Sequence, residues 1–147
     1  MAESKNESIN LLDLALGVAE EQEPVEITTG TWDLKIRRHH SGAQIADWQR
    51  RALQNNVDID AATNAIAEDG NLLPAADRTD NINALGKEYF RWYLGWISVE
   101  ATEEALDGIT DEITSLPFNA MKKVKRHIDQ LAGLVDEKGQ SIPFPES

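Results

Sequence analysis

The three histidines are the first residues in this chain that could bind a metal ion or move a proton near neutral pH. His39 and His40 are adjacent at the end of a predicted β-strand, and His127 lies far away on the polar side of a predicted helix. Neighbouring side chains on a strand point to opposite faces, so His39 and His40 cannot easily chelate one ion unless the strand has ended before them. We therefore expect three surface histidines and no metal site.

The sequence contains none of the compact motifs that define common catalytic sites. There is no HExxH zinc motif, no phosphate-binding glycine-rich loop and no Gly-x-Ser-x-Gly nucleophile turn. The chain has no cysteine, which excludes disulfides, thiolate nucleophiles and Cys-ligated zinc. We expect a protein without catalytic residues, metal or cofactor, and therefore not an enzyme.

The charges are strongly unbalanced toward acid. The chain has 26 acidic and 14 basic residues, a formal charge of −12, and repulsion from phosphate disfavours general nucleic-acid binding. Two acidic clusters lack the ligand spacing of an EF-hand loop and are interpreted as solvated faces: Glu20, Glu21 and Glu23, and Glu103, Glu104 and Asp107. One dense basic run could contact an acidic partner or the protein's own acidic surface, or be an ordinary solvated face: Lys122, Lys123, Lys125 and Arg126.

Helical periodicity begins near the N-terminus. Ser8 can cap a helix from Ile9 to about Glu21, which carries one apolar face: Leu11, Leu12, Ala15, Leu16 and Ala19. The acidic run that follows acts as a linker. A helix of about three turns is stable only when its apolar face is buried. We expect it to dock onto its own domain, onto a neighbouring copy, or into a groove of a client protein.

Alternating apolar residues predict one β-hairpin. They lie on both sides of a turn at Thr28–Gly30: Val25 and Ile27 before it, and Trp32, Leu34 and Ile36 after it. An isolated two-stranded ribbon is marginal in water and leaves open edges. Its apolar face must therefore pack on helices or extend a sheet formed with another subunit.

The remaining sequence predicts helices separated by polar or glycine-containing breaks. Caps, stops and apolar periodicity indicate five segments: Ser41 to a stop at Asn55–Asn56, Ala61 to Glu68, Asn81 to about Val99, Thr102 to Asp107, and about Leu116 to Asp136. We expect a loop from Asn71 to Asp80, an irregular segment around Gly108, and an extended tail after Gly139.

Two apolar patterns indicate how these helices pack. Trp92 and Trp96 lie one turn apart, where they either enter the core or anchor an interface, and we favour the core. The last helix has an apolar stripe typical of a helix packed against a partner helix: Met121, Val124, Ile128, Leu131 and Val135.

These elements define a mainly α protein with one small antiparallel β-hairpin. Its 147 residues are the size of one domain. We divide the chain into an N-terminal arm with an acidic linker (1–23), a domain of hairpin and helices (24–138) and a tail (139–147). The sequence has no apolar run long enough to cross a membrane and no secretion signal, so we expect a cytoplasmic protein without membrane contact.

The order of these features resembles a known family. An N-terminal arm, the ribbon Val25–Arg38, a set of helices and a last helix opened by Leu-Pro-Phe at Leu116–Phe118 are together similar to tail assembly chaperones of long-tailed (siphovirus-type) bacteriophages, over roughly Val25 to Val135. The resemblance implies a small acidic helical protein of the host cytoplasm that binds the tape-measure protein while the tail tube assembles around it. It implies tape-measure protein and tail-tube subunits as partners, a possible homo-oligomer, and no nucleotide hydrolysis.

Two other functional classes stay open. An acidic DNA mimic would need regularly spaced carboxylates on one exposed face, whereas those here are interrupted by Lys and Arg. A structural subunit of a virion or another complex would use the ribbon to add strands to a neighbour. The chaperone hypothesis comes first, and its candidate partner-binding residues are Leu11, Leu12, Leu16, Val25, Ile27 and Trp32.

Overall fold

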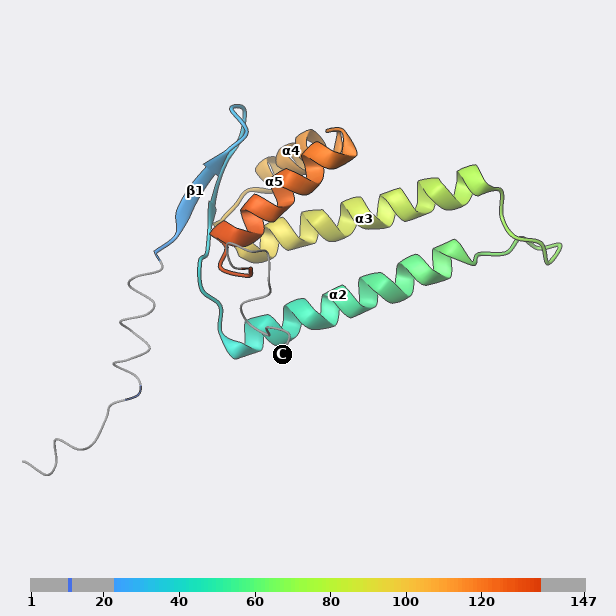
Figure 1. Ribbon diagram of the computed structural model, residues 1–147, viewed down its shortest axis with the longest axis horizontal. Helices are drawn as coiled ribbons and strands as arrows, with labels where there is room; N and C mark the ends of the chain where they lie inside the picture. Colours follow the sequence, from blue (N-terminus) through green and yellow to red (C-terminus); the bar gives the residue numbers. More distant parts are fainter. Residues whose placement is uncertain (1–10, 12–22, 136–147) are drawn as a thin grey trace, which may run out of the picture.

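The computed structural model describes Leu11 and residues 23–135. A small sheet and two short helices form a body, and two long antiparallel helices project from it (Figure 1). The elements follow in the order β1 (Val25–Thr28), β2 (Asp33–Ile36), α2 (Gly42–Thr63), α3 (Ala75–Ile97), β3 (Ser98–Glu100), α4 (Glu103–Thr114) and α5 (Phe118–Leu131). The predicted fold class, mainly α with a small antiparallel β element, is confirmed.

The sheet has three antiparallel strands in the order β1-β2-β3. The hairpin was predicted correctly, and Ile27 pairs with Leu34 across it. The third strand was not predicted, because the sequence analysis extends the helix to Val99. The helix instead ends at Ile97, whose carbonyl accepts a 2.6 Å hydrogen bond from the backbone N–H of Arg37. The chain therefore pairs with β2 as strand β3 directly after α3 ends.

Helix α2 is continuous through the stop predicted at Asn55–Asn56. Ser41 caps it as expected, in a reciprocal capping box with Gln44. Asparagine costs a helix interior only about 0.7 kcal/mol or less per residue, and packing along α3 outweighs that cost. The separate helix predicted from Ala61 to Glu68 does not form.

Helix α3 begins at Ala75, directly after Pro74, and not at Asn81. Proline fixes the backbone in a conformation suited to a helix start, so the predicted loop to Asp80 is too long. The connection between α2 and α3 closes on itself through a β-bridge between Ile66 and Leu72.

Stacked aromatic rings join α2 to α3. Trp96 stacks on Trp92 on its own helix and on Trp48 of α2, with ring centroids 6.2 and 5.9 Å apart. Arg51 of α2 lies over the rings of Tyr89 and Trp92. Both tryptophans of α3 are half-buried against the core, so these rings hold the helix pair together.

His40 is not a surface residue, contrary to the expectation for all three histidines. Its ring stacks on Trp96 with centroids 4.6 Å apart, and Nε2 lies 2.7 Å from the carbonyl oxygen of Ala132. Burial lowers the pKa of His40, and the contact with that carbonyl offsets part of the effect. His39 and His127 are exposed, as expected.

The core lies where the sheet, α4, α5 and the C-terminal half of α3 meet. Its largest fully buried hydrophobic side chains are Leu34, Ile36, Tyr93, Leu94, Ile97, Ile109 and Leu134. Ion pairs outside the core join α3 to α4: Arg91 binds Glu103 and Asp107, and Lys87 binds Asp111. The predicted acidic face of α4 is thus partly neutralised by α3.

Helix α5 ends at Leu131, five residues before the predicted end. Gly133 has a positive φ of 74°, a conformation that glycine adopts without steric cost. The Leu134 N–H then bonds the carbonyl of Asp129 at 2.9 Å, and the Leu134 side chain enters the core. The tail predicted after Gly139 lies outside the described residues.

A candidate protein-binding groove

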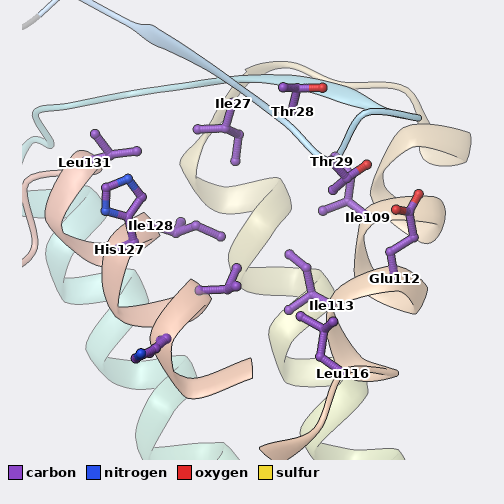
Figure 2. Close-up of a pocket in the computed structure, with 12 residues that line it drawn as sticks. Ile27, Thr28, Thr29, Ile109, Glu112, Ile113, Leu116, His127, Ile128 and Leu131 are labelled. Carbon is purple, nitrogen blue, oxygen red and sulfur yellow. The ribbon is translucent and has the colours of Figure 1, made fainter. Parts of the chain in front are cut away.

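An apolar groove of about 510 Å³ lies between the β-ribbon, α4 and α5. Figure 2 shows Ile27 descending from β1 between the two helices. Aliphatic side chains from all three elements and from the turn between α4 and α5 line it: Ile27, Ile109, Ile113, Leu116, Val124, Ile128 and Leu131. We call this site the groove.

The groove has a closed apolar floor and a polar rim. Ile109, Ile113 and Ile128 form the floor and are at most 4% exposed, whereas Leu116 at one end is 39% exposed. The titratable residues among its described lining are Glu112 on α4 and Lys123 and His127 on α5. These residues come from two separate helices around an apolar floor, so the arrangement is suited to binding apolar side chains.

The ribbon is held over α4 by Trp32. A Cβ atom added at Gly108 would lie 2.7 Å from Cδ1 of the Trp32 indole and closer still to Nε1 and Cε2. Only glycine lets the ring cross the helix at this point. The irregular segment predicted around Gly108 is therefore wrong, because α4 continues to Thr114 and the glycine serves a side-chain contact.

The turn of the ribbon is fixed by threonine hydroxyls. The Gly30 N–H donates to Oγ1 of Thr28 at 2.9 Å, and the Trp32 N–H donates to Oγ1 of Thr29 at 3.1 Å. Gly30 takes a φ of 94°. Because the turn is held from both sides, Thr28 and Thr29 stay at the edge of the groove that they line.

Helix α5 presents most of its positive charge to solvent. Within the described part of the chain, no ion pair reaches Lys122, Lys123 or Arg126, although Lys122 lies over the Phe118 ring. Lys125 differs, because it pairs with Asp129 at 3.2 Å. Of the three free charges, Lys123 lines the groove, whereas Lys122 and Arg126 line a separate cleft on α5.

Asp129 also accepts a hydrogen bond from the Tyr93 hydroxyl. Burial and the neighbouring Asp129 carboxylate raise the pKa of Tyr93 well above its ordinary value. The phenol therefore stays protonated and ties α5 to α3, on the side of α5 away from the groove.

Other apolar surface lies outside the groove. A second cleft of about 690 Å³ runs between α3 and the start of α5, and Leu116 lines both sites. The distal part of the α2–α3 hairpin exposes four large apolar side chains: Leu53, Val57, Ile66 and Leu72. The second cleft has one buried lining residue, Phe90, whereas three buried isoleucines form the floor of the groove.

The six partner-binding residues predicted from the sequence do not come together at one site among the described residues. Ile27 lines the groove, whereas Val25 and Trp32 pack against the core beside it. Leu11 is described and 72% exposed, and Leu12 and Leu16 lie outside the described residues. Sequence reasoning missed the α4 contributions, Ile109 and Ile113. It interpreted the α5 stripe as buried packing alone.

Within residue 11 and residues 23–135, no three metal-ligating side chains come together. No described helix is both long and apolar enough to cross a membrane. Comparison of the chain with protein-family models, with curated protein sequences and with solved structures gives no match.

Proposed function

We propose that the protein is a non-enzymatic chaperone that holds an amphipathic helical segment of another protein in the groove. Following the resemblance to tail assembly chaperones, the client is a tape-measure protein, which the chaperone delivers to tail-tube subunits in the host cytoplasm. The observation that carries the proposal is the groove itself, an open site with an apolar floor and a polar rim.

The lining of the groove suits the apolar side of a helical client. Small-molecule and cofactor sites have volumes of roughly 300 to 1,000 Å³, so a groove of about 510 Å³ has room for several side chains of such a client. A helix presents apolar side chains at positions i, i+3, i+4 and i+7, which is how amphipathic helices enter grooves. The floor of Ile109, Ile113 and Ile128 would receive those side chains, while Lys123 and Glu112 would face the polar flanks of the client.

Co-purification of the protein with a helical fragment of the tape-measure protein tests this function. Leu116→Asp places a charge at the exposed end of the groove, and Leu53→Asp makes the same change on the distal part of α2. Losing the burial of one leucine costs about 1.5 to 3 kcal/mol, which is roughly a tenfold to hundredfold loss of affinity. We expect that loss for Leu116→Asp and wild-type binding for Leu53→Asp. Because Leu116 also lines the second cleft, Phe118→Asp, which changes that cleft and not the groove, is a second control and should bind like the wild type. Equal binding by Leu116→Asp and Leu53→Asp, or an equal loss in Phe118→Asp, would remove the groove from the proposal.

A structural subunit is the second candidate. In the described part of the sheet, β1 and β3 each pair only with β2, so each leaves an edge that could accept a strand from a neighbour. Detection of the protein in purified particles would favour this class. A DNA mimic is less favoured, because the acidic residues of α4 are partly engaged by Arg91 and Lys87.

A further inference from the structure

We infer that, without a client, the N-terminal segment 8–22 of the same molecule occupies the groove and inserts Leu12 and Leu16 into it. The docking itself needs no client. Its consequence, that the segment competes with the client, rests on the proposed function. Apolar fit, charge and tether length each point to this occupant.

The apolar fit follows from the volume of the groove. A cavity of about 150 Å³ holds one benzene molecule, and the groove has about 510 Å³. It therefore has room for roughly three apolar side chains of leucine size. Segment 8–22 offers three leucines on one face of its predicted helix: Leu11, Leu12 and Leu16. Leu11 is 72% exposed, so the structure leaves this apolar side chain uncovered.

The charges of the two elements are opposite. Segment 8–22 carries three acids and no Lys or Arg: Asp13, Glu20 and Glu21. Helix α5 carries four basic residues and one acid. Lys123 lines the groove and pairs with no acid in the described part of the chain. An acidic helix in the groove would give the α5 side its missing counter-charges.

The tether is long enough for docking within one molecule. The seven residues from Gly17 to Glu23 span at most roughly 23 Å when extended. Ile27 already lines the groove and lies two residues after the start of β1, a distance of about 7 Å along a strand. The chain before β1 can therefore fold back along the strand and still bring Leu16 to the floor of the groove.

The same short tether favours docking within one molecule over exchange between copies. A short flexible linker gives an effective concentration on the order of 1 mM, far above micromolar working concentrations. If the intrinsic Kd of the segment is about 0.1 mM, the groove is filled in roughly ten of eleven molecules. Client affinity is then lowered about elevenfold.

A spin-label experiment tests the docking directly. The chain has no cysteine, so Asn10→Cys in the full chain accepts a single nitroxide on the polar side of the predicted helix. We expect the label to broaden the methyl NMR signals of Ile109, Ile113 and Ile128, and to leave that of Ile66, at the far end of the hairpin, sharp. A second sample mixes isotope-labelled chains without nitroxide and unlabelled chains with it. Broadening should be absent there.

Matched substitutions complete the test. Leu16→Asp should abolish the broadening, whereas Leu14→Asp, on the opposite side of the predicted helix, should preserve it. Uniformly sharp groove signals, broadening in the mixed sample, or broadening that survives Leu16→Asp would each overturn the inference.

The client experiment separates this inference from the proposed function. Leu16→Asp should raise affinity for the tape-measure fragment about tenfold, and Leu14→Asp should leave it unchanged. Docking without any fragment binding would contradict the proposed function alone. Fragment binding without docking would contradict the inference alone.

Discussion

Gly108→Ala is expected to destabilise the protein, although the same change normally stabilises a helix. Replacing glycine by alanine in a helix interior gains about 1 kcal/mol. Here the new Cβ would lie 2.7 Å from one indole atom of Trp32 and closer to two others, and such overpacking costs roughly 1 to 3 kcal/mol. The net expectation is a loss of up to about 2 kcal/mol.

Gly86→Ala is the matched control, because a Cβ at Gly86 in α3 meets no atom within 4 Å. We expect that variant to gain about 1 kcal/mol. Urea unfolding followed by circular dichroism should separate the two variants by roughly 1 to 3 kcal/mol. In a Trp32→Ala background the clash partner is gone, so Gly108→Ala should become as stabilising as Gly86→Ala. If Gly108→Ala stabilises the wild-type protein by the same amount as Gly86→Ala, Trp32 does not lie on α4. The position of the β-ribbon, which forms one side of the groove, would then be wrong.

Two further predictions concern the supports of the groove. The pKa of His40 is lowered below its ordinary 6.5, so as pH falls through 6.5 the unfolded chain binds the proton first and the folded state loses stability. Urea unfolding between pH 7.5 and 5 should therefore show a smaller loss of unfolding free energy for His40→Gln than for the wild type. An identical pH dependence of the two proteins would contradict the burial of this ring. Tyr93→Phe removes the hydroxyl that donates to Asp129 and should cost about 1 to 3 kcal/mol, whereas an unchanged unfolding midpoint would show that this bond is absent.

Local patterns in the sequence were sufficient for part of the fold. The alternation around Thr28–Gly30 predicted the hairpin, because the side-chain period of a strand is a local property. Ser41 predicted the start of α2 for the same reason, since a cap bonds to its own first turn. The predicted helix ends were wrong where contacts with distant parts of the chain determine the structure. At Asn55–Asn56, for example, packing against α3 stabilises α2 beyond the predicted stop.

The groove could be predicted only in fragments. The α5 stripe indicated an apolar face but not that one flank of it stays open beside α4. Gly108 looked like a helix breaker because nothing near it in the sequence points to Trp32, which crosses the helix there. The sequence left the role of Lys123 open between a contact with acidic groups and a solvated face, and its position at the rim emerges only when α5 is placed against the ribbon.

The most direct test of the proposed binding role is a methyl NMR titration of the full chain with a helical tape-measure fragment. The groove account predicts saturable shifts of the Ile109, Ile113 and Ile128 signals, with Ile66 unchanged. Saturable shifts confined to the distal hairpin around Ile66, with the three groove signals unmoved, would contradict it.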